Sequence, residues 1–144
     1  ADRVLERGGE VTGVIPHGLM VREAGHEGVT EMVVVESMHE RKSRMVELAD
    51  GFIALPGGLG TMEELLEVLT WAQLGVHGKP CGVLNVEGYF DRLVGFFDHA
   101  VEEGFLRPDH RDLVIVEEEP APLLDALASY EAPRVPQWIS PEAT

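Results

Sequence analysis

The chain has 144 residues, of which 44% are hydrophobic, enough for one domain with a sizeable core. Its 11 basic and 26 acidic residues give a formal net charge of −15, which repels polyanions such as DNA and RNA. No run approaches the roughly 20 apolar residues that cross a bilayer, and no basic-then-apolar leader opens the chain. We therefore expect no nucleic-acid partner and no membrane association. The single cysteine, Cys81, allows no internal disulfide and lies in an apolar run, as a core residue of a cytoplasmic protein would.

Strand and helix patterns alternate along the chain. Five short, mostly continuous apolar runs predict strands covered on both faces, at residues 11–15, 32–35, 52–55, 82–86 and 113–116. Helical patterns follow at residues 38–49, 61–74, 89–103 and 121–130. This order predicts an α/β fold, a doubly wound parallel sheet with helices on both faces.

We expect this domain to occupy residues 1–130, followed by an extended C-terminal tail at residues 131–144 that contains three prolines. Residues 2–7 resemble the end of a helix that runs into the first strand. Because a doubly wound sheet would have a strand before that helix, we expect the sequence to begin inside the domain, without its first strand.

A glycine-rich turn joins the third predicted strand to a helix, with the sequence Pro56-Gly57-Gly58-Leu59-Gly60-Thr61. Glycine lets the backbone approach a ligand closely, and a helix start offers unpaired N–H groups and a positive dipole end to an anion. The alternative is a tight turn without a ligand. Three glycines at the carboxyl end of a strand favour a binding site, because open α/β sheets bind ligands there. The turn is neither a P-loop nor a complete GxGxxG fingerprint.

Glu64 has two interpretations. The segment Thr61-Met62-Glu63-Glu64 matches a capping box with Thr61 as N-cap and Glu64 at the third position, which would make Glu64 structural. A functional carboxylate beside the turn is the other interpretation, and spacing alone does not separate them.

Basic residues open the helix predicted at residues 38–49. Arg41 falls on its apolar face with Lys42 beside it, whereas His39 should point away. That face is defined by Met38, Met45, Leu48 and Ala49. A cation on a core-facing stripe near a helix start needs compensation, either from a bound phosphate or from a glutamate in a salt bridge.

Two motifs together resemble the LOG (lonely guy) family, whose members have often been described as lysine decarboxylases. The family pattern PGGxGTxxE is complete at residues 56–64, and its companion Met-His-x-Arg-Lys is complete at residues 38–42. The segments 13–16 and 75–80 also look like the family, so the resemblance covers about residues 1–130. Family members begin with a strand and a glycine-rich turn that help to bind the nucleotide, and no residues here match that turn.

The resemblance implies a Rossmann-like homodimer or higher homo-oligomer. Its reaction would be hydrolysis of the N-glycosidic bond of a nucleoside 5′-monophosphate, a cytokinin riboside monophosphate or AMP, to free base and ribose 5-phosphate. Arg41 and Glu64 would be catalytic. Lys42 and Glu63 would support the site, and Met38 would line the base pocket. The phosphate would be held by Gly57, Gly58, Gly60 and Thr61. No metal and no cofactor is implied.

Three alternatives accompany this interpretation. A pyridoxal phosphate decarboxylase needs a Schiff-base lysine, and neither Lys42 nor Lys79, the two lysines of the chain, suits that role. A nucleotide or molybdenum-cofactor carrier on the same fold would need the phosphate loop but no carboxylate aimed at the sugar. The third is a purely structural dimer subunit, which would leave Arg41 unexplained. Separately, Trp71 either packs in the core or contributes to a subunit interface.

Overall fold

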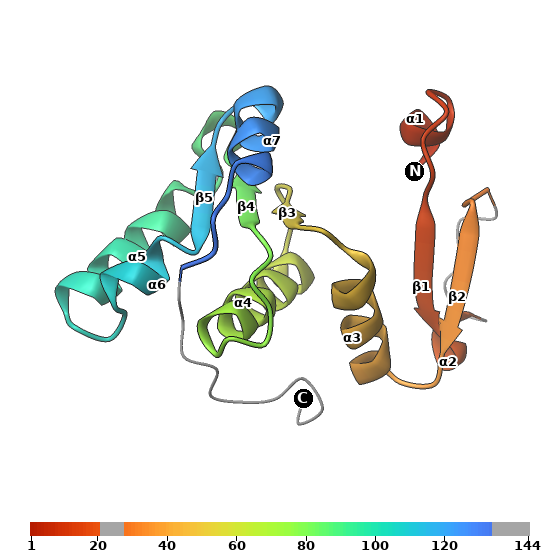
Figure 1. Ribbon diagram of the computed structural model, residues 1–144, viewed down its shortest axis with the longest axis horizontal. Helices are drawn as coiled ribbons and strands as arrows, with labels where there is room; N and C mark the ends of the chain where they lie inside the picture. Colours follow the sequence, from red (N-terminus) through yellow and green to blue (C-terminus); the bar gives the residue numbers. More distant parts are fainter. Residues whose placement is uncertain (21–27, 134–144) are drawn as a thin grey trace. The chain divides into compact units, whose positions relative to one another are not determined.

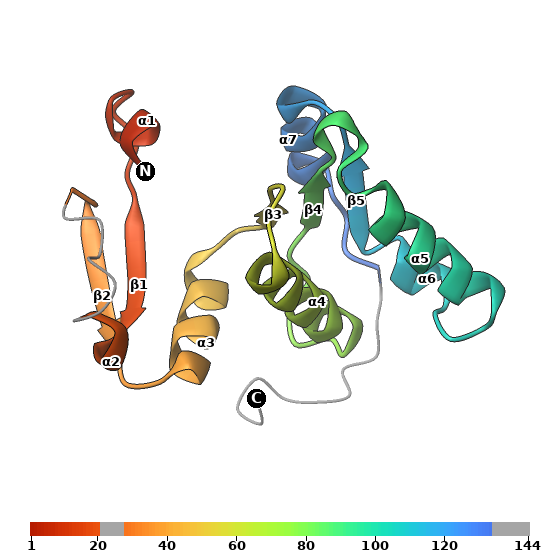
Figure 2. The ribbon, with the colours of Figure 1, turned by 180° about the vertical axis from the view of Figure 1, so that it is seen from behind.

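The computed structural model describes residues 1–20 and 28–133. Its contacts divide the chain into two compact units, Ala1–Ala49 and Asp50–Thr144, which are described separately (Figures 1 and 2). Residues 131–133 adopt neither helix nor strand, and the rest of the predicted tail lies outside the described residues. The prediction of one domain over residues 1–130 stays a prediction.

Within residues 1–20 and 28–49, the first unit is a two-stranded parallel sheet with three helices. Thr12 pairs with Glu31, and the strands run together to the pair of Pro16 and Val35. The Ser37 hydroxyl caps α3 by accepting from the Glu40 N–H at 3.1 Å, while the Glu40 carboxylate accepts from the N–H of Glu36. The elements are α1 (Asp2–Leu5), β1 (Thr12–Pro16), α2 (His17–Met20), β2 (Glu31–Val35) and α3 (Met38–Leu48).

Over residues 50–133, the second unit is a three-stranded parallel sheet in the order β3-β4-β5, with β4 in the centre. Together with the first unit, it confirms the predicted α/β class and all five predicted strands, each within two residues of the predicted bounds. Its elements are β3 (Phe52–Ala54), α4 (Leu59–Gln73), β4 (Cys81–Leu84), the 3₁₀ turn η1 (Val86–Gly88), α5 (Asp91–Glu102), α6 (Pro108–Arg111), β5 (Val114–Glu117) and α7 (Pro120–Ala128).

Helices cover both faces of this sheet, because neighbouring residues of β4 point to opposite sides. Val83 joins a buried cluster with side chains of α4, α5 and β5 on one side, namely Leu65, Phe97 and Val114. Gly82 faces α7 on the other side, where a β-carbon would come within 2.8 Å of the Leu123 side chain. A glycine at position 82 therefore lets α7 lie directly on the central strand.

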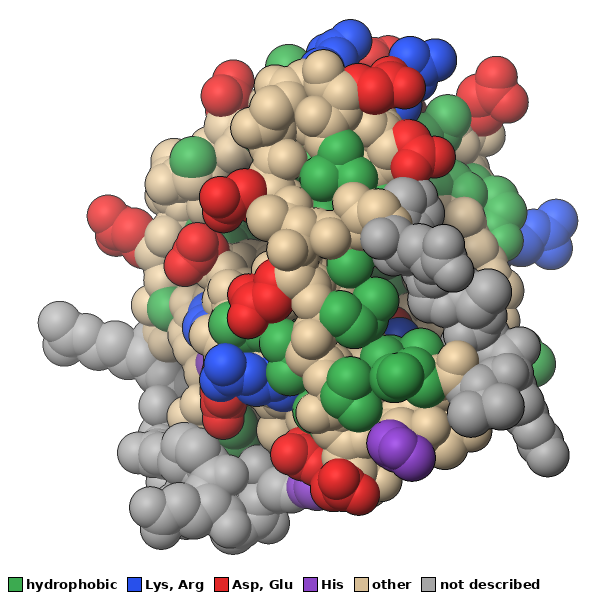
Figure 3. Space-filling model, turned by 90° about the vertical axis from the view of Figure 1, so that its right-hand side faces the viewer, with side chains coloured by type: hydrophobic (Ala, Val, Ile, Leu, Met, Phe, Trp, Pro, Cys, Tyr) green, Lys and Arg blue, Asp and Glu red, His purple; other side chains and the backbone are tan. Residues whose placement is uncertain are grey.

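Several sequence-based expectations for single residues are met in this core. Cys81 is 1% exposed, and burial raises the pKa of its thiol to about 12, so it behaves as a packed core residue. Trp71 is buried within its own chain, which agrees with its core-packing interpretation. Other large apolar side chains stay exposed, and Figure 3 shows hydrophobic side chains open to solvent on one face. Among the most exposed are Leu59, Phe96, Phe105 and Leu124.

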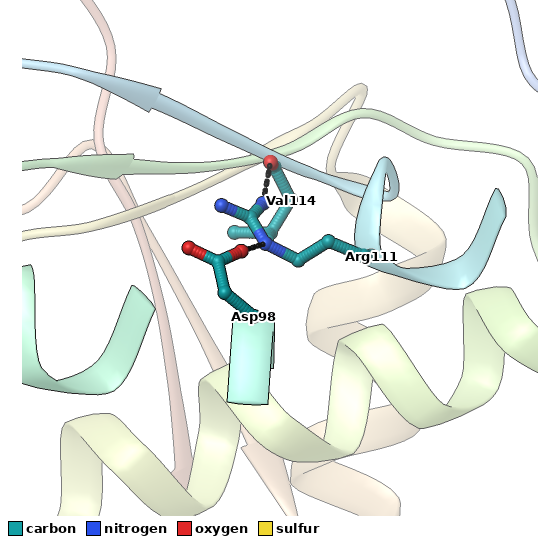
Figure 4. Close-up of polar contacts among 3 residues, drawn as sticks. All are labelled: Asp98, Arg111 and Val114. Atoms are coloured by element: carbon teal, nitrogen blue, oxygen red, sulfur yellow. Dashed lines mark hydrogen bonds and ion pairs between the residues drawn. The ribbon is translucent and has the colours of Figure 1, made fainter. Parts of the chain in front are cut away.

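An arginine ties three elements of the second unit together (Figure 4). The Arg111 Nε donates to Asp98 Oδ1 of α5 at 2.6 Å, and its Nη1 donates to the carbonyl of Val114 in β5 at 3.5 Å. The Arg111 side chain is only 21% exposed. This contact fixes α6, a helix of four residues, against its neighbours.

Candidate functional site

The predicted site residues fall in both units. Met38, Arg41 and Lys42 belong to α3 in the first unit, whereas the glycine turn and Glu64 belong to the second unit. The structure brings the turn, Thr61, Glu63 and Glu64 together at the start of α4. The site residues of the two units are therefore described separately.

The glycine turn leads from the carboxyl end of β3 into α4. Gly58 is the N-cap in an extended conformation, and the N–H of Met62 donates to the Gly58 carbonyl at 3.2 Å, which makes it the first intrahelical bond. The N–H groups of Leu59, Gly60 and Thr61 precede that bond, so helix geometry leaves them pointing out of the helix start. These groups and the positive end of the α4 dipole form an anion-binding arrangement.

The predicted capping box is wrong. α4 begins at Leu59, two residues before the predicted start, so Thr61 is the third helical residue and not the N-cap. The backbone of Gly58 takes the capping position without a side-chain hydrogen bond, and the Thr61 side chain packs against Gly57 instead. Glu64 is therefore not the third residue of a capping box, and the structural role predicted from that pattern does not apply to it.

Glu64 shares a face of α4 with the helix start. It follows Gly60 by four residues and Thr61 by three, the spacings that place side chains on one side of a helix. Helical side chains also lean toward the N-terminus, which inclines the Glu64 carboxylate toward the exposed N–H groups. Glu64 is half-buried, whereas Glu63 is exposed.

The three glycines of the turn differ in what surrounds them. A β-carbon on Gly57 would collide with the hydroxyl and β-carbon of Thr61. A β-carbon on Gly58 or Gly60 would have no atom of the described chain within 4 Å. The backbone is therefore open on the Gly58 and Gly60 side, where a ligand could come into contact with it.

Sequence reasoning missed Tyr89, a residue outside the turn that contacts it. Its hydroxyl donates to the Gly57 carbonyl at 2.6 Å. Tyr89 follows the β4 strand and η1, 32 residues from its partner. No short motif could have connected the two positions, because the contact depends on the pairing of β3 with β4.

Helix α3 packs on the two-stranded sheet of its own unit. All 11 residues of α3 are described, and none is buried. The core-facing stripe expected on this helix stays a prediction. Met38, Met45 and Leu48 are 37–46% exposed. Arg41 and Lys42 are half-buried, and His39 is exposed as predicted.

Lys79 lies at the wrong end of the sheet for pyridoxal phosphate chemistry. It precedes β4, whereas the glycine turn follows β3, and these parallel strands run in register from Phe52 opposite Cys81. The turn therefore lies at the carboxyl ends of the strands and Lys79 at their amino ends, about 13 Å apart along the strand direction. Lys79 therefore does not fit a Schiff-base site whose phosphate is held by the turn.

A cavity of about 340 Å³ lies beside the carboxyl ends of β4 and β5. It is lined by Asn85 and by three consecutive glutamates, Glu117, Glu118 and Glu119. Their negative potential opposes phosphate binding, so this cavity is not the anion site. In residues 1–20 and 28–133, no helix has both the length and the apolar character needed to cross a bilayer.

A parallel α/β fold whose glycine turn opens a helix at the carboxyl edge of the sheet is the arrangement of nucleotide- and phosphate-binding proteins. Comparison with known proteins gives the family. The chain belongs to the family described as "Possible lysine decarboxylase", whose sequence model matches residues 1–127.

Curated relatives carry a different activity in their names and confirm the resemblance to the LOG proteins. The chain is 53% identical over 123 residues to the probable cytokinin riboside 5′-monophosphate phosphoribohydrolase LOGL2 of Oryza sativa subsp. japonica, covering 85% of this chain and 50% of that protein. It is 52% identical over 127 residues to the cytokinin riboside 5′-monophosphate phosphoribohydrolase LOG1 of Arabidopsis thaliana, covering 88% and 60%. The chain thus spans half to three-fifths of the length of these relatives.

Proposed function

We propose that this protein hydrolyses the N-glycosidic bond of a nucleoside 5′-monophosphate and releases the free base and ribose 5-phosphate. The observation that carries the proposal is the start of α4, where exposed N–H groups and the Glu64 carboxylate share one face of the helix. The names of the rice and Arabidopsis relatives support the same reaction, and their substrate is a cytokinin riboside monophosphate. AMP, which carries the same phosphate and ribose, is proposed as a second substrate.

The turn supplies the phosphate site in this proposal. A protein with a net charge of −15 needs local positive potential to hold a phosphate dianion. The N–H groups of Gly58, Gly60 and Thr61, the α4 dipole and the cations of α3 would provide it. Lys42 and Glu63 support the site, and the half-exposed Met38 lines the base pocket.

The catalytic pair is Arg41 and Glu64. Cleavage of the glycosidic bond passes through an oxocarbenium-like state, which a carboxylate can stabilise or attack with an oriented water. Glu64 takes that role. Arg41 binds the 5′-phosphate or holds Glu64 ionised and oriented. The reaction needs no cofactor. We further propose that the protein acts in the cytoplasm as a homodimer or a higher homo-oligomer.

The test is release of base by the full-length protein from AMP and from isopentenyladenosine monophosphate. Arg41→Ala and Glu64→Gln should each lower turnover at least a hundredfold, while the unfolding midpoint changes little. Arg44→Ala and Glu67→Gln, on the same two helices, are the matched controls and should keep turnover within about twofold. Full turnover in both Arg41→Ala and Glu64→Gln would contradict the assignment.

A second measurement separates hydrolysis from the carrier alternative. Binding of AMP is followed by calorimetry alongside the search for free adenine. Tight binding without release of the free base from either nucleotide would replace the hydrolase with a carrier. The two relatives described above are phosphoribohydrolases by name, so we expect release.

A further inference from the structure

The peptide group between Gly57 and Gly58 is a point where the phosphate loop could lose its shape. Both flanking residues are glycines, which rotate about their backbone bonds with little steric restriction. A peptide between two glycines can therefore turn over at low cost. Something outside the turn has to fix its orientation.

The Tyr89 hydroxyl supplies that constraint, through its 2.6 Å hydrogen bond to the Gly57 carbonyl oxygen. A trans peptide is planar, with its C=O and N–H directed to opposite sides. Holding the Gly57 carbonyl on the Tyr89 side therefore directs the Gly58 N–H to the other side. Gly58 is the N-cap of α4, so its N–H is the first of the four orphan donors of that helix.

Tyr89 is itself held by a rigid turn. The buried Asn85 side chain accepts from the Phe90 N–H at 2.6 Å and donates to Asp91 Oδ1 at 2.8 Å. Glu87 and Gly88, with φ of 51° and 70°, reverse the chain between these bonds. Phe90, 1% exposed, anchors the turn in the core, and the Tyr89 ring packs edge-on against it at 5.1 Å.

We propose that Tyr89 is a positioning residue of the phosphate loop, which locks the Gly57–Gly58 peptide so that the Gly58 N–H faces the 5′-phosphate. The inference rests on the proposed function, because it takes the nucleotide phosphate as the ligand of the turn. Tyr89 acts through the backbone and does not touch the reacting atoms. Its contribution is therefore to substrate affinity and not to the chemical step.

The test compares Tyr89→Phe with Tyr130→Phe, the chain having two tyrosines. Phenylalanine keeps the ring and removes the donor. For Tyr89→Phe we expect KM and Kd for AMP to rise about tenfold, the scale of one weakened hydrogen bond to a charged group, with kcat within about twofold. Kd for adenosine, which lacks the phosphate, should not change. Tyr130→Phe should match the wild type throughout.

Direct observation of the amide gives an independent result. Titration with inorganic phosphate should shift the Gly58 ¹⁵N–¹H resonance in the wild type, and this shift should be lost or strongly reduced in Tyr89→Phe. Tyr89→Phe should unfold at the wild-type midpoint within experimental error, since Tyr89 is 54% exposed.

Other outcomes overturn the proposal. A fall in kcat at unchanged KM would place Tyr89 among the catalytic residues. Equal weakening of AMP and adenosine would assign it to the base or ribose site, and unchanged affinity would show that the turn holds its shape alone. If the wild type binds AMP but releases no base from AMP or from isopentenyladenosine monophosphate, the hydrolase proposal fails, while a weaker AMP affinity of Tyr89→Phe still supports the positioning role. Absence of any AMP or phosphate binding by the wild type would overturn both.

Discussion

The side chain of Thr61 lies directly against the α-carbon of Gly57 and leaves no room for a β-carbon at that position. Gly57→Ala should therefore force the turn apart and lower the free energy of unfolding by about 1–3 kcal/mol. Thr61→Ala in the same chain removes the clashing hydroxyl and should restore part of that loss. Urea unfolding of the two single variants and the double variant measures the coupling, and strict additivity would contradict the contact.

Gly60 should behave in the opposite way, because a methyl group there meets no described atom within 4 Å. Gly60→Ala places a better helix former in the first turn of α4 and should raise the free energy of unfolding by up to about 1 kcal/mol. The same methyl group would occupy the space proposed for the phosphate, so AMP affinity should fall. A stabilised variant with unchanged affinity would show that the ligand does not approach this part of the backbone.

His77 should make stability depend on pH. Its Nδ1 accepts from the Lys79 N–H at 3.2 Å, so the proton of the neutral ring lies on Nε2, which donates to the Val68 carbonyl at 3.0 Å. Burial, followed by the positive charge of Lys79, lowers the pKa of His77 below its ordinary value near 6.5.

The unfolded chain therefore binds a proton at His77 at a higher pH than the folded chain does. The contribution of His77 to the free energy of unfolding is fully present above about pH 6.5. It is lost as the pH falls toward the lowered pKa, by at most about 1.4 kcal/mol per pH unit. Urea midpoints measured between pH 7.5 and 5.5 should show this slope. His77→Gln should flatten it and His39→Gln, at an exposed position, should not; equal slopes in all three proteins would contradict the assignment.

The Asp98–Arg111 ion pair should contribute measurably, because the arginine is held between three elements. Asp98→Ala should lower the free energy of unfolding by about 0.5–1 kcal/mol, with a smaller loss at 1 M salt. Glu47→Ala is the matched control, since it breaks the exposed Arg44–Glu47 pair within α3 and should cost less. An equal loss in the two variants would mean that the bridging of α5, α6 and β5 by Arg111 adds nothing to the free energy of unfolding.

Much of the fold could be predicted from local patterns. The continuous apolar runs at residues 32–35 and 113–116 are strands because both of their faces are covered, and the structure confirms them as β2 and β5. The glycine turn was recognisable because its chemistry depends on consecutive residues. By contrast, the four-residue helices α2 and α6 are too short to produce a periodic pattern.

The failures have physical causes. The capping-box pattern predicted Thr61 as the N-cap of α4, but Gly58 occupies that position. The packing of the Thr61 side chain against Gly57 depends on the fold of the turn and could not be predicted from the spacing of residues. The apolar spacing of α3 predicted a helix, which the structure confirms at Met38–Leu48, but spacing does not identify the element that covers the apolar face. The Tyr89 contact joins positions that are brought together only by the pairing of β3 with β4.

The central strand of the second unit also contains its own reporter. Cys81 is the one thiol of the chain, it is 1% exposed, and a thiolate forms there only at strongly alkaline pH. A thiol reagent can modify it only after β4 has separated from its neighbours, so the rate of modification measures how often that strand opens. Ligands that stabilise the sheet would slow the labelling of a residue that they never touch, without any engineered probe.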